Sequence, residues 1–320
     1  MQTRYWAVGL AVAVAAGCAQ TGNVPADAPG SAKTLMQWRT ADKDKDDEKP
    51  DEKKGEAEDG GKKDKKDDAG KAGKPDKEPE KDELKTDRPD FTESSSTVGL
   101  GRVQLEAGYT YSRDHATGVS AHSYPEALLR IGLFADWFEL RLGQNVAASR
   151  IRTAAVTDRT AGPEDFYAGV KLGLTEQKAW GPELALILFA TVPTGDRAYT
   201  ANRTLPGASF QYGWEVSDFL SVGGSSIATA AVEEDRHGYV ELAQSVTVGY
   251  ALTDKLGAYT EVFGFAPHGA NSAATAPMYY ANGGFTYKVT PNLQYDIRVG
   301  AGLNAAADDF FAGVGFAYRR

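Results

Sequence analysis

The chain has almost no cysteine: Cys18 is the only one among 320 residues. A single thiol excludes an internal disulfide framework. Histidine is also scarce, and none of the four histidines has a metal-binding spacing to another ligand. His122 and Ser123 are neighbours in a predicted strand, where adjacent side chains point to opposite faces, so they cannot form a catalytic pair. No phosphate loop or dinucleotide motif is present. We therefore expect no enzyme activity, no metal and no cofactor.

Long apolar runs are missing as well. From residue 98 onward, no stretch reaches the roughly 18 apolar residues that a membrane-spanning helix needs. The apolar run Tyr5–Ala16 is too short to span a bilayer and follows the positively charged Arg4, which is typical of an export signal. We predict a signal peptide over residues 1–17 and a post-cleavage segment over residues 18–40.

Cys18 directly follows the string Ala15-Ala16-Gly17. This string resembles the lipobox of bacterial lipoproteins, in which the cysteine after the cleavage point receives a lipid. We predict lipidation of Cys18. The alternative is an ordinary cleaved signal that discards the cysteine or is cut close to it.

Aromatic residues are absent between Ala41 and Leu84, where Lys, Asp, Glu, Gly, Ala and Pro make up nearly the whole sequence. Such a segment cannot bury enough apolar surface to offset the entropy lost on ordering. We predict that residues 41–85 form a disordered, charged tether. Its positive and negative charges nearly balance, which argues against a nucleic-acid partner.

The rest of the chain alternates apolar and polar residues, the period of a strand with two different faces. In the first segment one face holds Val103, Leu105, Ala107, Tyr109 and Tyr111. About twelve such segments follow one another, each close to the length that a tilted strand needs to cross the hydrocarbon layer. The gaps between them alternate between short and long, as in up-and-down hairpins.

These features predict an all-β fold: a transmembrane antiparallel β-barrel of about 12 strands over residues 98–320. The alternative is a soluble β-sandwich, which is disfavoured because its turns are expected every 8–12 residues. In outer-membrane barrels the short turns face the periplasm and the long loops face outward. The signal peptide and the barrel together place the protein in the outer membrane of a Gram-negative-type bacterium, with the tether in the periplasm.

The polar faces of the strands carry charges of both signs. We predict that the lumen is lined by Arg102, Glu106, Glu126, Arg130, Glu139, Arg141, Lys171, Glu215, Asp296 and Arg298. Arg102 with Glu106, Glu126 with Arg130, and Glu139 with Arg141 are expected to form a ladder of ion pairs. The ladder is either a selectivity lining or internal glue that narrows the lumen, and we favour the second. Residues 86–97 are a candidate lumen plug, in which Arg88 and Asp90 join the network.

A resemblance rests on Lys85–Ser94 (Lys-Thr-Asp-Arg-Pro-Asp-Phe-Thr-Glu-Ser) and Val98–Tyr109. This pair resembles the opening signature of the outer-membrane "transporter" barrels of the phenol meta-pathway degradation family. Weaker fragments also fit: Leu129–Leu133, Phe138–Gly143, Gly169–Gly173, Val192–Gly195, Leu293–Asp296 and Gly313–Gly315. The resemblance implies a barrel linked to uptake of aromatic or other hydrophobic compounds, without catalytic residues.

Two features depart from the family pattern. They are the lipobox with its tether, and the final residues Tyr318-Arg319-Arg320, where barrels usually end on an aromatic residue read by the assembly machinery. Our leading hypothesis is a porin-like outer-membrane channel for passive passage of small hydrophobic or aromatic compounds. Its partners are membrane lipid, that solute and the outer-membrane assembly machinery. The alternative is a sealed structural or surface-interaction barrel lipoprotein without transport.

Overall fold

The computed structural model describes residues 84–152, 157–233, 236–272 and 275–320. The predicted signal peptide, Cys18, the segment 18–40 and nearly all of the tether lie outside these residues. Among the described residues there is no helix long and apolar enough to cross a membrane. The described chain is all-β, and each of its paired strands runs antiparallel to its neighbours.

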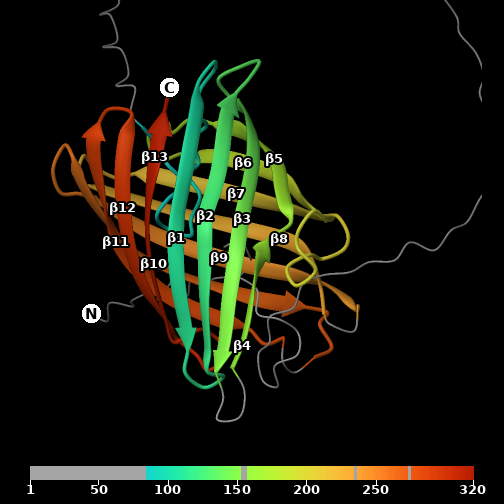
Figure 1. Cartoon of the computed structure of the whole chain (residues 1–320). Helices are drawn as coiled ribbons and strands as arrows, with labels where there is room; N and C mark the ends of the chain where they lie inside the picture. Colours follow the sequence, from blue (N-terminus) through green and yellow to red (C-terminus); the bar gives the residue numbers. More distant parts are fainter. Residues whose placement is uncertain (1–83, 153–156, 234–235, 273–274) are drawn as a thin grey trace, which may run out of the picture. The chain divides into compact units, whose positions relative to one another are not determined.

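The strands run up and down in sequence order, joined by short turns and by longer loops (Figure 1). They are β1 (Val103–Asp114), β2 (Val119–Gly132), β3 (Phe138–Arg152), β4 (Thr157–Pro163), β5 (Phe166–Thr175), β6 (Glu183–Val192), β7 (Leu205–Glu215), β8 (Leu220–Val232), β9 (Gly238–Ala251), β10 (Leu256–His268), β11 (Met278–Thr290), β12 (Leu293–Gly302) and β13 (Phe310–Arg319).

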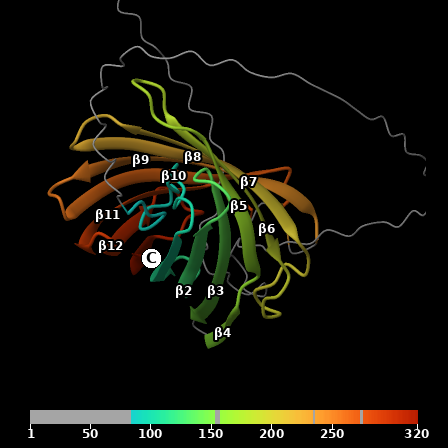
Figure 2. The ribbon, with the colours of Figure 1, turned by 90° about the horizontal axis from the view of Figure 1, so that it is seen from above.

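The thirteen strands occupy twelve positions in the wall. Successive strands pair as neighbours, and β1 pairs with β13, which closes the ring (Figure 2). β4 and β5 share one position because both pair with β3, β4 along its second half and β5 along its first half. The fold is thus a closed 12-stranded antiparallel barrel, which confirms the predicted fold class. Closure gives the wall strands other than β4 a partner on both sides, as a lipid environment requires. Among the described strands, the short β4 pairs on one side only, with β3.

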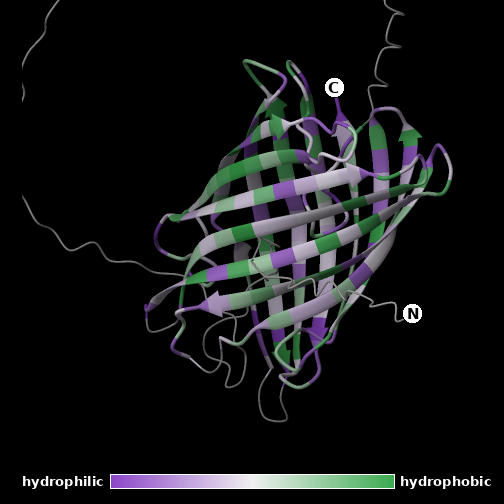
Figure 3. Ribbon diagram, turned by 180° about the vertical axis from the view of Figure 1, so that it is seen from behind, coloured by the Kyte–Doolittle hydropathy of each residue, from purple (hydrophilic) through white to green (hydrophobic). Residues whose placement is uncertain are grey.

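The two-residue alternation sorts the side chains between the lumen and the outer face, and Figure 3 shows it as bands along the strands. On β3, Glu139, Arg141 and Asn145 are buried in the lumen. Phe138 and Leu140, on the alternate positions of the strand, face outward. Large apolar side chains on the outer face are exposed, as at Ile297 (54%). A polar interior with an apolar exterior is the reverse of a soluble sandwich and suits a membrane barrel.

The wall begins later than predicted. β1 starts at Val103, five residues after the expected start at Val98. Residues 84–98 instead run inside the ring, and we call them the inner segment (Figure 2). Gly99 (φ +81°) and Gly101 (φ +74°) adopt backbone conformations that favour glycine, and there the chain turns from the lumen into the wall.

Candidate functional site

Asp87 lies at the centre of a charged network that joins the inner segment to the wall. Its carboxylate contacts Nη1 of Arg130 (3.3 Å), Nη1 of Arg141 (2.6 Å) and Nζ of Lys171 (3.1 Å). Its backbone N–H donates to the Glu106 carboxylate at 3.1 Å. Burial alone would raise the pKa of Asp87, but the three cations outweigh it and hold that pKa below its ordinary value. The ionised carboxylate therefore ties the inner segment to β2, β3 and β5.

Arg130 and Arg141 lie directly opposite each other on β2 and β3, where like charges repel. Both are completely buried, so each needs anionic partners. Glu139 accepts from both, from Arg130 Nε at 2.8 Å and from Arg141 Nη1 at 2.9 Å. Arg130 also contacts Glu106 (2.9 Å), and Arg141 contacts Glu93 of the inner segment (2.5 Å). Acids on every side thus balance the two guanidinium groups.

Arg88 holds the inner segment to the opposite part of the wall. Its Nη1 donates to Glu126 Oε2 at 2.6 Å. Its Nη2 donates to Asp296 Oδ1 at 3.3 Å and to the carbonyl oxygen of Val314 at 3.2 Å. One side chain therefore bridges β2, β12 and β13, on both sides of the place where the ring closes.

Arg298 on β12 forms the next layer of contacts. It donates to the carbonyl oxygen of Pro89 (3.0 Å) and to Thr110 Oγ1 (2.7 Å), and lies 3.6 Å from Glu126. Its guanidinium also lies 5.9 Å from the ring centre of Phe311, a distance suited to a cation–π contact. This arginine therefore connects the charged network to an aromatic surface.

Residues 91 and 92 of the inner segment are held by hydrogen bonds to one acid of the wall. Glu261 on β10 accepts from the backbone N–H groups of Phe91 (2.8 Å) and Thr92 (2.7 Å) and from Asn282 Nδ2 (2.6 Å). Asp90 is half-buried and lies close to Glu261. Burial, together with the charge of Glu261, raises the pKa of Asp90 well above its ordinary value.

Most of the residues that were predicted to line the lumen take part in this network or lie beside it. They are Glu106, Glu126, Arg130, Glu139, Arg141, Lys171, Asp296 and Arg298 in the wall, with Arg88 and Asp90 in the inner segment. Of the three expected ion pairs, the one between Glu139 and Arg141 is present. The other two differ, because Glu126 pairs with Arg88 and Glu106 pairs with Arg130.

Arg102 and Glu215 lie apart from this network. Arg102 precedes the first strand, and its backbone N–H donates to the carbonyl oxygen of Gly99 at 3.4 Å. Glu215 ends β7, where its side chain is 70% exposed and pairs with Lys85 at 2.6 Å. Both positions are at the rim, so the expectation that they line the lumen does not describe these two residues.

Asp87, Glu93 and Glu261 are network residues that the sequence did not nominate as sites. Asp87 and Glu93 are part of the opening string Asp87–Glu93 that carried the family resemblance, so a signal was present. Glu261 lies in a segment with large side chains on both faces, so its orientation could not be read from alternation.

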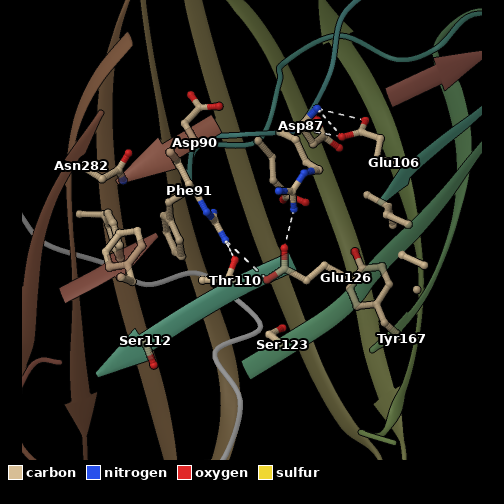
Figure 4. A pocket seen from close by; sticks show the side chains of 18 of the residues that line it. Asp87, Asp90, Phe91, Glu106, Thr110, Ser112, Ser123, Glu126, Tyr167 and Asn282 are labelled. Atoms are coloured by element: carbon tan, nitrogen blue, oxygen red, sulfur yellow. Dashed lines mark hydrogen bonds and ion pairs between the residues drawn. The ribbon is translucent and has the colours of Figure 1, made fainter. Parts of the chain in front are cut away.

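A cavity of about 1380 Å³, including its opening toward solvent, lies beside the inner segment (Figure 4). Its charged boundary is formed by residues of the network. The remaining surface is largely apolar and comes from two clusters. The first cluster contains Phe91, Phe263, Phe265, Tyr280 and Phe311, and the second contains Tyr167, Ile187, Phe189 and Ile227. Figure 4 shows Phe91 and Tyr167 on opposite sides of this space.

The first cluster is built from close aromatic contacts. The ring of Phe263 stacks on Phe91 at 4.5 Å and on Tyr280 at 5.0 Å, and Phe311 lies across Tyr280 at 6.0 Å. Three polar atoms at the cavity boundary, Asn282 Oδ1, Arg298 Nε and Glu126 Oε1, have no hydrogen-bond partner within the described chain. The cavity therefore combines an aromatic wall with a few unused polar groups, the usual composition of a small-molecule site.

The sequence profile of a family described as "Putative MetA-pathway of phenol degradation" matches residues 86–319. The fold is similar to the crystal structure of the COG4313 outer membrane channel from Pseudomonas putida F1. That match has a TM-score of 0.57 and 13% sequence identity, and covers 71% of this chain and 98% of that chain. The KdgM porin matches with a TM-score of 0.43 and 10% identity, covering 67% of this chain and 98% of that chain. No curated protein sequence matches the chain.

Proposed function

The chain belongs to the family described as "Putative MetA-pathway of phenol degradation", and from this premise we propose that it is an outer-membrane channel for small hydrophobic or aromatic molecules. Passage is passive, without chemical turnover. The observation that carries this proposal is the cavity inside the closed barrel, whose apolar surface comes mainly from residues of the two clusters. The shared fold with an outer-membrane channel supports the coarser part of the proposal.

The apolar wall favours a hydrophobic solute over a hydrophilic one. Porin lumens that carry water-soluble molecules are polar throughout, whereas here Phe263, Tyr280 and Phe311 face the cavity together with Phe189 and Ile227. Burying apolar surface of a solute gains about 25 cal/mol per Å². An aromatic ring additionally gains from offset or edge-to-face contacts with such side chains.

The inner segment supports selection by exclusion. Its network fills the lumen between β1, β2, β3 and β5 with ion pairs, and Arg130 and Lys171 are completely buried there. A large hydrated solute would have to displace these pairs, which costs several kcal/mol for each charge left without a partner. The network thus acts as a constriction, and a small apolar molecule beside it meets the aromatic wall instead.

The location follows from the same architecture. We propose that the short-turn end of the barrel faces the periplasm and that the long loops face outward. Residues 41–85 then lie in the periplasm. Lipidation of Cys18 stays a prediction, and it would anchor the tether to the membrane.

The proposal is tested by uptake of N-phenylnaphthylamine, an aromatic dye that fluoresces in membranes and is excluded by an intact outer membrane. Cells that carry the full-length protein are expected to take up the dye several-fold faster than cells without it. Phe263→Ala removes the central ring of the first cluster and is expected to reduce the increase in the rate of dye uptake. Phe285→Ala, on the exposed outer face of β11, is the matched control.

Dye uptake by the same cells also tests the alternative, a sealed barrel without transport. An unchanged rate of dye uptake in cells that display the correctly folded barrel at the surface would overturn the transport proposal. That result would favour a sealed barrel with a structural or surface-interaction role.

A further inference from the structure

A row of arginines crosses the outer face of the barrel at the long-loop end of β1 to β4, which is the lower end of these strands in Figure 1. The strand register places Arg113 opposite Ser120, Ser120 opposite Arg150, and Arg150 opposite Arg159. Because directly paired residues share a face, all four side chains lie on one side of the sheet. We call Arg113, Arg150 and Arg159, with the nearby Arg152, the arginine row.

The arginine row faces away from the lumen. Ser149 and Thr160, which precede Arg150 and follow Arg159, bond each other and Tyr199 on the inner side of the wall. Adjacent residues in a strand point to opposite faces, so Arg150 and Arg159 point outward. Arg113, Arg152 and Arg159 are exposed.

The row lies just beyond the apolar band of the outer face. Two residues before Arg113 on β1 is Tyr111, which contacts His122 of β2 with ring centres 5.2 Å apart. Next along the same face come Tyr109 and then Leu105 and Val103, all exposed. Aromatic side chains mark the membrane interface, and charged lipid headgroups lie immediately beyond it. The arginine row therefore sits at headgroup level.

The positive charge of the row is poorly balanced by the described protein. Arg150 and Arg159 are direct cross-strand neighbours, an arrangement in which like charges repel. Arg150 Nε is buried without a hydrogen-bond partner among the described residues. The sequence between β3 and β4, residues 153–156, is Thr-Ala-Ala-Val and contains no acid.

The nearest acids are engaged elsewhere. Asp158 accepts the backbone N–H of Arg159 at 2.8 Å. Asp309 accepts from the backbone and the Nδ1 of His115, each at 2.7 Å. Asp114 accepts from the backbone N–H of Ala116 at 2.8 Å and from the hydroxyl of Thr117. The four guanidinium groups thus outnumber the three acids beside the row, Asp114, Asp158 and Asp309, of which Asp309 also lies near Arg113.

We propose that the arginine row binds the phosphate groups of a phosphorylated glycolipid in the outer leaflet of the membrane. A phosphate placed between Arg150 and Arg159 would relieve their repulsion and accept from the unused Nε. Guanidinium groups match phosphate oxygens in paired hydrogen bonds, and they are less strongly hydrated than ammonium groups. The acyl chains of such a lipid would lie along the apolar band below the row. The free phosphate ion offers the same charge but lacks this apolar contact, so the lipid is the favoured source.

The experiment uses the full-length protein in phosphatidylcholine nanodiscs that contain lipid A with two phosphates. Lipid retained after gentle detergent extraction is counted by native mass spectrometry. The wild-type protein is expected to retain the phosphorylated lipid, and the double variant Arg150→Gln/Arg159→Gln is expected to bind it at least tenfold more weakly. Arg197→Gln, an exposed arginine of the β6–β7 loop, is the matched control and should behave as wild type.

Three further arms complete the test. Lipid A without phosphates should be lost from the wild-type protein, and inorganic phosphate at millimolar concentration should not displace the phosphorylated form. If the double variant fails to fold, Arg150→Lys/Arg159→Lys keeps the charge but removes the forked geometry, and it should bind less tightly than wild type. Equal retention of phosphorylated and unphosphorylated lipid, or displacement by inorganic phosphate, would overturn the proposal. These outcomes are independent of dye transport through the lumen.

Discussion

Gly108 on β1 and Gly315 on β13 lie directly opposite each other, and the guanidinium of Arg88 occupies the space that their side chains would fill. A Cβ atom at either glycine would lie 2.3 Å from an atom of that guanidinium. Two glycines therefore form a recess in the wall, and the recess lets Arg88 reach Glu126 and Asp296.

Filling this recess should release the inner segment. Gly108→Ala or Gly315→Ala is expected to displace Arg88, break its ion pairs and increase the single-channel conductance of the refolded barrel in planar bilayers. Gly173→Ala is the control, because its added methyl group would make only ordinary contacts at 3.5 Å or more. Unchanged conductance in both recess variants would show that Arg88 does not hold the inner segment in place.

Arg130→Ala should destabilise the protein strongly. The substitution leaves Glu106 and Glu139 buried without their main cation, and breaking a buried ion pair in this way costs about 3–5 kcal/mol. The measurement is urea unfolding of the refolded barrel in detergent, with Lys255→Ala in an exposed turn as the control. A loss below about 1 kcal/mol would mean that solvent or rearrangement compensates the two acids.

Deleting Thr86–Ser94 should open the lumen and change its ion preference. The deletion removes three acids, Asp87, Asp90 and Glu93, and one cation, Arg88, so the charge of the lumen becomes more positive by two. We expect larger single-channel conductance and a shift of the ion preference toward anions relative to the wild-type barrel. Removal of nine residues from the tether, 60–68, is the matched control. An unchanged conductance would contradict the role of residues 86–94 as a lumen plug.

Acid should release the inner segment only at low pH. The folded-state pKa of Asp87 is lowered, so its stabilising contribution is complete above the ordinary value of 3.8 and is lost as the pH falls toward the lower folded value. Asp90 has the opposite effect on docking of the inner segment. Its pKa is raised, so it takes up a proton more readily in the docked state, and docking gains stability as the pH falls from neutral. Docking should therefore persist from neutral pH to about pH 4 and weaken below it.

Conductance measured across this range gives the test. It should stay constant down to about pH 4 and rise below about pH 3, and Asp87→Asn should already show the larger conductance at neutral pH. A rise in wild-type conductance that is centred near pH 6 would contradict this assignment and point to a histidine instead.

The strands of the barrel wall could be predicted because the alternation that identifies a strand is contained within a short stretch of sequence. The two-residue alternation in segments such as Leu293–Gly302 identifies a strand without any knowledge of its neighbours. The exception is the β4–β5 position, where Glu164 and Asp165 interrupt one wall position and Thr157–Pro163 forms a separate strand. Sequence alternation gave no sign of that strand.

The lumen contacts were less predictable because they depend on the inner segment. Alternation shows that Glu126 and Arg130 face inward, but the strand bulges between Tyr124 and Ala127, and Glu126 (φ +46°) turns toward Arg88. No periodicity identifies Asp87 as the shared partner of three cations, since the residues come from four separate parts of the chain. Charge on an inward face predicts that a partner exists, and only the fold identifies it.

Arg88 touches both sides of the seam, through the Val314 carbonyl and Asp296 on one side and Glu126 on the other. Its position has a consequence for assembly. The residue lies a short distance before β1 in the chain, and its contacts join strands on both sides of the seam. Docking of the inner segment should therefore stabilise the pairing of β1 with β13, and a chain in which Arg88 cannot dock is expected to close its seam more slowly.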